Sequence, residues 1–375
     1  MRAVLFPASG GQAVFDAGRI LGFSLEQGSM DALMPGDIIG GTLTVRVYAP
    51  ELSPRDWRGG ALRLYAGGEA FGVYTIQSAE DTDIRGVYKL AAQDALSGRL
   101  EEAFGDPPED PGSLAAYWAA WLGRAGVTSG SAVPEMEVES APDWSDTSLR
   151  DAGSQIARAA GAYILPEYDG TVSLKPLNAP RVWEVSASEC LSVKDGYRSF
   201  GPVGCLAMTD SDGETALSIG EGDAIVYEED PLITDLAPAA ANVLGAEYAK
   251  LEAEWAGRLG ARPGDTLRLC GGKYTGRINR LTIAMDPEPR ASAWCAVPED
   301  SGGKALTRDG HVNASALVGR ISGRMLEDGS VTLRKLDEAL VTQPAVTALT
   351  EYLSALTDDQ LKTDALAAAI RRAAQ

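Results

Sequence analysis

The sequence contains a single histidine, His311, among 375 residues. Histidine is the usual proton carrier near neutral pH and the commonest nitrogen ligand of zinc. A metal site built on two imidazoles of one chain is therefore excluded, and any Ser-His-Asp or Cys-His catalytic set would depend on His311, which lies in a predicted turn. The chain also lacks a G-x-S-x-G elbow and both common glycine-rich phosphate-binding motifs. We expect no enzymatic activity, no catalytic residue and no cofactor.

Cysteine and long apolar runs are scarce as well. The cysteines have no C-x-x-C spacing, and a chain of this length needs no disulfide staples, so we expect reduced, mostly buried thiols in preference to a disulfide or a zinc site. They are Cys190, Cys205, Cys270 and Cys295. No run approaches the roughly 20 apolar residues of a membrane-spanning helix, and the first residues contain no long apolar signal segment. The sequence predicts a soluble protein without a membrane segment.

Basic residues are outnumbered, since 33 Lys and Arg face 53 Asp and Glu, for a net charge of −20. This excess repels phosphate, so specific nucleic-acid binding is not expected. Hydrophobic residues at 45% and charged residues at 23% are ordinary globular proportions. Most of the chain should therefore fold, and its length allows two or three domains.

Carboxylates are so abundant that some pair will lie by chance at the separation of the two catalytic carboxyl groups of a glycosidase. Such a pair is therefore no evidence for glycosidase activity. The segment Asp210-Ser211-Asp212-Gly213-Glu214, followed by Glu221, superficially resembles a calcium loop. Its glycine is fourth instead of sixth, so a hairpin turn at Asp212-Gly213 is the favoured interpretation. No metal site is predicted.

Hydrophobic patterning predicts an α+β fold that is mostly β. Residues 41–48 alternate apolar and polar side chains, as a half-buried strand does, and similar short runs follow at 62–64, 71–76 and 86–92. These runs predict a small antiparallel β-barrel-like domain over residues 1–95.

Residues 96–181 should form an α+β insert. Ser113 is a candidate N-cap for a helix that ends at Gly126 and places Trp118 and Trp121 in a core. A second helix is expected from Asp146 or Thr147 to Gly161. A hairpin should follow, with strands at 163–165 and 172–174 around a type I′ turn at Asp169-Gly170.

A second β-barrel-like domain with one crossing helix is predicted over residues 182–300. Its expected strands are Leu217–Tyr227, Leu251–Leu259, Thr266–Leu269 and Arg277–Met285, and its helix runs from Pro238 to Lys250.

Residues 301–375 are predicted to form a helical C-terminal arm that also contains β-turns. Thr357-Asp358-Asp359-Gln360 is a capping box, so one helix should begin there. The arm has one aromatic residue, and its narrow apolar seams bury too little area to offset the backbone entropy of folding alone. We expect these seams to form an assembly interface with copies of the chain or with a partner. The interface residues are Leu349, Leu353, Leu356, Leu361, Leu366 and Ile370.

Several motifs occur in an order typical of one family. Gly72-Val73-Tyr74-Thr75-Ile76 resembles that family's "G-x-Y/F-x-V/I" strand, and Thr147–Leu177 is similar to its helix and D-G hairpin. Asp230–Thr234 and Pro263–Leu267 resemble its "N-P-L-I" and "P-G-D" segments. Over residues 20–290 the chain resembles the hub proteins of phage tail tips, the amino-terminal part shared by tail-associated lysins and by baseplate hubs.

Two departures from the family pattern concern local loops. Asp230 stands where the family usually has Asn, and Ala256–Ala261 lacks the commoner "G-D-P-x-L" approach to the Pro-Gly-Asp turn. Beyond the hub region, Glu327–Thr332 resembles the "D-G-S-I-T" turns of phage fibre proteins.

The resemblance implies a structural virion protein at the tail tip, assembled in the bacterial host cytoplasm. It would form a homotrimer whose two barrel-like domains per chain present six similar barrels to a hexameric distal-tail or tail-tube ring. Tape measure protein and a distal fibre or receptor-binding protein are the other implied partners, in host attachment and DNA ejection. The acidity either lines a DNA channel or serves solubility, and the sequence does not separate these two roles.

Two alternatives are weaker. The chain could be a receptor- or carbohydrate-binding tail-tip protein or, ranked third, a cell-wall glycosidase built from unrecognised carboxylates. About 75 residues follow the hub region, without the histidines or Cys-His pair of tail-associated peptidases. The sequence therefore favours a non-enzymatic tip.

Overall fold

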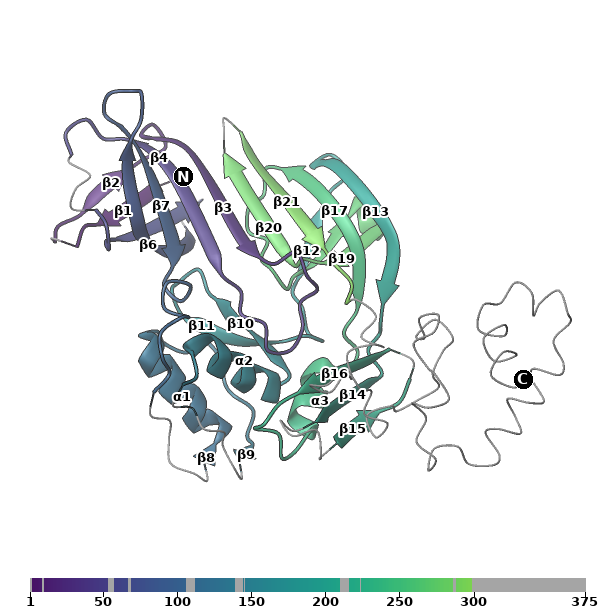
Figure 1. Cartoon of the computed structure of the whole chain (residues 1–375). Coiled ribbons are helices and arrows are strands. Elements are labelled where there is room, and N and C mark those ends of the chain that lie inside the picture. Colours follow the sequence, from purple (N-terminus) through teal and green to yellow (C-terminus); the bar gives the residue numbers. More distant parts are fainter. Residues whose placement is uncertain are drawn as a thin grey trace, which may run out of the picture. The chain divides into compact units, whose positions relative to one another are not determined.

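The computed structural model describes residues 2–8, 10–52, 57–66, 69–105, 112–138, 144, 146–209, 216–222, 224–285 and 288–298. They belong to one compact unit, Met1–Ser301. Strands dominate these ranges, and three α-helices accompany them (Figure 1). This confirms the predicted α+β, mostly β class. The boundaries of the four predicted domains stay a prediction.

The largest sheet is antiparallel and combines strands from both ends of the described chain. Its strands are β1 (Arg2–Phe6), β2 (Ala13–Phe15), β3 (Ile20–Gly28), β4 (Gly41–Tyr48), β5 (Ala61–Ala66), β6 (Glu69–Asp81), β7 (Val87–Asp94), β13 (Cys190–Phe200), β17 (Tyr248–Ala256), β20 (Arg280–Met285) and β21 (Pro289–Cys295). The order of these eleven strands is β13-β17-β21-β20-β3-β4-β7-β6-β5-β1-β2. The β3·β20 pair joins the amino-terminal strands to the later ones.

Four smaller sheets complete the β structure of the described residues. They pair β8 (Gly112–Ser113) with β9 (Glu137–Val138), β10 (Ala162–Pro166) with β11 (Val172–Pro176), β12 (Val182–Val185) with β18 (Thr266–Leu269) and β19 (Tyr274–Arg277), and β14 (Cys205–Thr209) with β15 (Ala216–Gly220) and β16 (Ile225–Glu229). A short 3₁₀ turn, η2, spans Cys270–Gly272.

The helix ends follow the capping chemistry of the sequence. In α1 (Leu114–Ala125), the Ser113 hydroxyl accepts the Ala116 N–H at 3.2 Å, and Gly126 ends the helix with φ 69°. Ser148 caps α2 (Leu149–Ala159), which therefore begins slightly later than predicted. The third helix, α3, spans Ala237–Val243.

Several predictions of element length are wrong. The strand predicted for Arg277–Met285 is β20, which begins at Arg280 because Arg277 belongs to β19, and the strand predicted for Leu251–Leu259 is β17, which ends at Ala256. The helix predicted for Pro238–Lys250 ends at Val243, because Gly245 adopts φ 86° and Tyr248 begins β17. The strand predicted for Leu217–Tyr227 is interrupted after Gly220, which adopts φ 95°, so that β15 and β16 are separate strands.

The turn predicted between β10 and β11 also differs in type. A type I′ turn needs positive φ at both central residues, but only Gly170 of the Asp169-Gly170 pair has it, at 94°. The Gly170 N–H donates to the Glu167 carbonyl at 3.0 Å. The hairpin therefore has a longer loop that ends on a left-handed glycine, and Asp169 accepts the Thr171 N–H at 2.9 Å.

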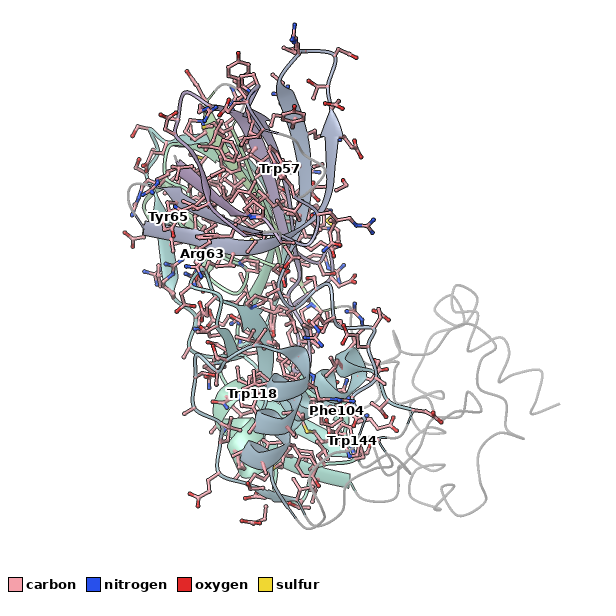
Figure 2. All side chains as sticks on the ribbon, turned by 90° about the vertical axis from the view of Figure 1, so that its left-hand side faces the viewer. Trp57, Arg63, Tyr65, Phe104, Trp118 and Trp144 are labelled. Atoms are coloured by element: carbon pink, nitrogen blue, oxygen red, sulfur yellow. The ribbon has the colours of Figure 1, made fainter. Side chains whose placement is uncertain are left out.

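The earlier strands β3–β7 and the later strands β13 and β17–β21 form two β segments. These segments share one hydrophobic core, in which Leu25 and Leu43 of the first are buried with Trp255 and Ile283 of the second. A second core fills the insert around its helices, where Trp118 and Trp121 stack with ring centroids 5.0 Å apart. Their predicted core role is confirmed, and the Trp121 indole N–H donates to the Leu149 carbonyl at 2.7 Å. Figure 2 shows Trp118, Phe104 and Trp144 around these helices and Trp57 among the strands.

The two β segments repeat one strand order. The first segment has β3-β4-β7-β6-β5, and the second has β13-β17-β21-β20 together with β19-β18. The long strand β6 of the first segment pairs with β5 along one half and with β7 along the other. In the second segment two separate strands replace it: β19 pairs with β18, and β20 pairs with β21. Both segments have a register shift just after the start of their first strand, β3 or β13.

Matching hydrogen bonds support this equivalence. Gly59-Gly60 exchanges two backbone hydrogen bonds with Ile76, of 2.8 and 2.9 Å, just before β5. Gly264-Asp265 exchanges the same two bonds with Ile278, of 2.7 and 2.9 Å, just before β18. The segments therefore share backbone geometry at a turn whose side chains differ.

Glycine substitutions at this repeated turn test how the insert packs on the second segment. Gly59 and Gly264 both have positive φ, but an added Cβ meets nothing within 4 Å at Gly59 and would overlap the buried Tyr163 hydroxyl at Gly264. We expect Gly59→Ala to lower the free energy of unfolding by about 1 kcal/mol. Gly264→Ala should lower it by roughly 2 to 4 kcal/mol, because overpacking adds to the backbone strain. Urea unfolding measures both, and equal losses would contradict this packing.

Candidate assembly surface

The six predicted interface residues lie outside the described residues, as do His311 and the acidic segment 210–214. They are Leu349, Leu353, Leu356, Leu361, Leu366 and Ile370. Their roles stay predictions. The surfaces that can be described belong to the large sheet and to its contacts with the insert.

In the described ranges, no three His, Cys, Asp or Glu side chains are grouped to hold a metal ion. None of the helices in those ranges has the length and apolar character needed to cross a bilayer. Cys205 and Cys295 are buried free thiols, whereas Cys190 and Cys270 are half-buried.

A groove of about 540 Å³ lies over β13, β17, β21 and β20 on the polar face of the large sheet. Acidic and basic side chains pair across neighbouring strands in and beside it. The pairs are Lys194–Glu252 at 2.9 Å, Arg280–Glu26 at 2.7 Å and Arg290–Glu254 at 3.6 Å. This face therefore presents neutralised pairs and not a uniformly negative wall.

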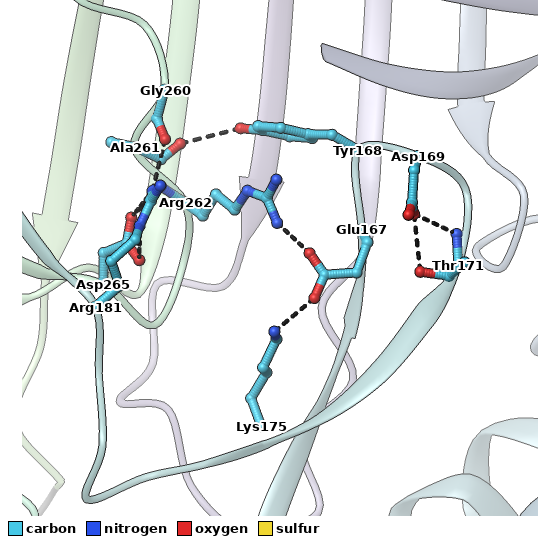
Figure 3. A network of polar contacts seen from close by, with 10 residues as sticks. All are labelled: Glu167, Tyr168, Asp169, Thr171, Lys175, Arg181, Gly260, Ala261, Arg262 and Asp265. Atoms are coloured by element: carbon cyan, nitrogen blue, oxygen red, sulfur yellow. Dashed lines mark hydrogen bonds and ion pairs between the residues drawn. The ribbon is translucent and has the colours of Figure 1, made fainter. Parts of the chain in front are cut away.

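A polar network attaches the β10–β11 hairpin to the Pro-Gly-Asp turn (Figure 3). The Glu167 carboxylate bonds both Lys175, at 2.6 Å, and Arg262. The Arg262 guanidinium also lies 3.9 Å from the centre of the Tyr168 ring, and the Tyr168 hydroxyl donates to the Ala261 carbonyl at 3.0 Å. Burial would raise the pKa of Glu167, but the bonded cations outweigh it and lower that pKa.

Asp265 organises the turn itself. Its carboxylate accepts the Arg262 N–H at 2.9 Å and pairs with the Arg181 guanidinium at 2.5 Å. Burial raises the pKa of Asp265 despite the nearby cations. The "P-G-D" motif thus supplies a turn in which Asp265 holds both the turn's own backbone and Arg181, the residue just before β12.

A second polar contact between the insert and the later strands is acidic. The Arg158 side chain of α2 lies 3.3 Å from Glu228 and 3.9 Å from Asp230, and its guanidinium donates to the Glu229 carbonyl at 2.7 Å. Burial raises the pKa of Glu228 to about 7. It also raises the pKa of Asp37 to about 6, although the positive charge of Arg158 acts in the opposite direction. One guanidinium faces several carboxyl groups that are poorly solvated.

Asp230 stands where the resembling family has Asn, and its surroundings explain how an acid is tolerated. The side chain is fully buried; one carboxyl oxygen accepts the Leu232 N–H at 2.9 Å, and the other has no hydrogen-bond partner. Burial raises the pKa of Asp230 to about 7. A protonated carboxyl group is nearly isosteric with an amide, so it can fill an asparagine position in this turn.

No family model matches the sequence, and no curated protein matches it. A solved structure shares the fold. A tail protein from Neisseria meningitidis matches with a TM-score of 0.52 at 12% identity, covering 80% of this chain and 96% of that chain.

Two further structures match with lower TM-scores. The 43 kDa tail protein of prophage MuSo2 from Shewanella oneidensis gives 0.49 at 10% identity, covering 79% of this chain and 98% of that one. Prophage tail protein gp18 from Listeria monocytogenes gives 0.48 at 10% identity, covering 78% and 94%. The Neisseria match confirms the resemblance to tail proteins at the level of the fold.

Replacing the acid at 230 tests this account of the buried carboxyl group. The raised pKa of Asp230 means that the folded protein holds a proton that the unfolded chain releases above about pH 4, so the free energy of unfolding falls as the pH rises from about 4 to about 7. Asp230→Asn keeps an acceptor for Leu232 and removes the ionisable group. We expect it to raise the free energy of unfolding by about 1 to 3 kcal/mol at pH 8, with little change near pH 4.

Glu229→Gln is the matched control, because Glu229 is the neighbouring residue, at the end of β16, and its side chain is exposed. It should leave the pH dependence unchanged in denaturant titrations at pH 4 and pH 8. A loss of stability at pH 8 in Asp230→Asn would show that the ionised form is the one the fold needs.

Proposed function

We propose that this chain is a structural protein of a phage or prophage-derived tail tip, where it forms a trimeric hub. The observation that carries the proposal is the fold shared with the Neisseria meningitidis tail protein, 96% of which is covered. In the virion, the hub would join the hexameric distal-tail or tail-tube ring to a distal fibre or receptor-binding protein. Assembly would take place in the host cytoplasm.

The repeated strand order supports a role in symmetry adaptation. Three chains that each contain two equivalent β segments present six similar units, which suits a sixfold ring. Tape measure protein is a further proposed partner within the tube. Residues 301–375 would act as the arm that recruits the distal component, with their leucine seams covered by symmetry mates or by that component.

The neutralised polar face supports a lining role during DNA ejection. Nonspecific affinity for DNA comes from cations that contact phosphates. Each basic side chain of the three pairs in and beside the groove contacts a glutamate, which leaves it less available to phosphate. A hub channel lined in this way would pass DNA without retaining it.

The oligomeric state tests the proposal. We expect native mass spectrometry of the full chain to show a complex of three times the 39.3 kDa chain mass. A chain truncated after Asp300 should remain a trimer, because the β segments form the ring, but should no longer bind the distal component. A monomeric or dimeric full chain at micromolar concentration would contradict a trimeric hub.

Peptidoglycan hydrolysis separates the hub from the glycosidase alternative. The purified chain should not clear a suspension of bacterial peptidoglycan. Clearing that is lost on substituting one or two carboxylates would replace the structural proposal with an enzymatic one. Glycan binding through residues after 301 would instead favour the receptor-binding alternative.

A further inference from the structure

The joint between the two β segments suggests how separate chains could join. This inference rests on the proposed hub and concerns the surface through which its copies associate. Within the chain, the edge strand β3 of the first segment pairs with β20 of the second, in a register that runs from Phe23–Met285 to Gly28–Arg280. Because the two segments repeat one strand order, each strand of this joint has a counterpart elsewhere in the molecule.

The counterpart of β3 is β13, since both strands open their segment and share the same register shift. The counterpart of β20 is the outer half of β6, Ser78–Asp81, because Ile278 before β20 matches Ile76. In the described part of the chain, β13 pairs with β17 alone, and Ser78–Asp81 pairs with β7 alone. Both counterparts therefore present a free strand edge.

The β13 edge also exposes large side chains. Tyr197 is 91% exposed and Leu191 is 51% exposed. Tyr197 has φ 53°, within an irregular stretch between Asp195 and Ser199. A positive φ is uncommon for a residue other than glycine, so this edge keeps a bulky ring in solvent at some cost in backbone strain.

We propose that β13 of one copy pairs antiparallel with the outer half of β6 in a second copy, so that the β3·β20 joint is repeated between chains. The contact is heterologous, because it uses two different edges, and every chain carries both of them. Such head-to-tail contacts close into a ring when the rotation at the joint permits. All joints of the ring, within and between chains, would then have one geometry.

The equivalence fixes the register. Ser24 lies opposite Ala284 in the β3·β20 joint. Ser24 and Lys194 each lie two residues beyond the register shift of their strand, and Ala284 and Thr82 each lie six residues beyond the matched isoleucine. Lys194 should therefore face Thr82 of the next chain.

Charge is complementary in this register. In the joint within the chain, Arg280 reaches Glu26 diagonally at 2.7 Å. Between chains, the same diagonal relation brings Glu80 to Lys194, which would then lie between Glu80 and its partner within the chain, Glu252; the side chains of Lys194 and Glu80 are exposed.

One like-charge contact opposes the joint. Asp195 would lie opposite Asp81, and directly opposed like charges are unfavourable between strands. Lysines and bulges at sheet edges also discourage indiscriminate pairing. The β13 edge would thus accept its matched partner and disfavour others.

Disulfide trapping tests the register. Lys194→Cys with Thr82→Cys creates a pair expected to be non-hydrogen-bonded, with a Cα separation near 4.5 Å that suits a disulfide. Ser24→Cys with Ala284→Cys places the same pair within one chain as the geometric control. Under mild oxidation of the full chain, the first variant should give covalent dimers and trimers on a denaturing gel, and the control should give a linked monomer. Each single-cysteine variant should stay monomeric on that gel.

The outcomes distinguish this joint from the hub proposal. A trimer in native mass spectrometry without covalent linkage of Lys194→Cys/Thr82→Cys overturns the joint and leaves the hub intact. Linkage by Lys194→Cys alone would mean that two β13 strands pair symmetrically, which also overturns it. A full chain that remains monomeric overturns both proposals.

A charge swap provides a second readout that does not depend on disulfide geometry. Lys194→Glu or Glu80→Lys alone should raise the dissociation constant of the trimer at least roughly tenfold, and the double swap should restore most of the loss. Asp81→Asn should tighten association, because it removes the opposed charge. No rescue by the double swap would overturn the Lys194–Glu80 contact and with it the proposed register.

Discussion

Backbone pairing between β3 and β20 is the contact on which the rest of the described structure depends. It joins residues as far apart in sequence as Glu26 and Arg280, which are separated by 254 positions. Gly28 permits the close approach, since a Cβ there would overlap the Asn279 carbonyl oxygen. Without this pairing, the two β segments would expose two free edges and divide their common core. Its closure has a high entropic cost that the shared core must offset.

Polar contacts of two chemical kinds fix the insert to the later part of the described chain, at the Pro-Gly-Asp turn and at the end of β16. The Glu167 network is charge-balanced and lowers the pKa of its acid, so it persists at neutral pH. The contact around Arg158 has more carboxyl groups than cations, and burial raises their pKa values. The first contact therefore holds the hairpin over a wide pH range, whereas the second stabilises the fold more strongly as the pH falls toward 4.

Local signals made much of the fold predictable. Ser113 and Gly126 mark the ends of α1, and the alternation in residues 41–48 matches β4. Features set by distant partners were not predictable. Tyr248 suits a helix by spacing but belongs to β17, where it pairs with Phe200, and the β3·β20 pairing has no local signature.

The family resemblance implied two similar β domains per chain, but the residues themselves carry little trace of this internal repeat. The equivalent strands β5 and β18 share only a Leu-Arg-Leu core, at 62–64 and 267–269, because backbone hydrogen bonds and not side chains define the repeated turn. The proposed joint between β13 and the outer half of β6 depends on the register of this repeat, so the sequence could not predict it. The predicted leucine seams at Leu349 to Leu356 address a different contact, that of the arm.

The central claim is that two equivalent β segments per chain build a sixfold-like ring from three chains. Single-particle electron microscopy of the full-length protein tests it most directly. The account predicts axial views with six lobes of similar density around a central opening, related by threefold symmetry. Particles with twofold symmetry, or monomers that show one sheet with free edges, would contradict it.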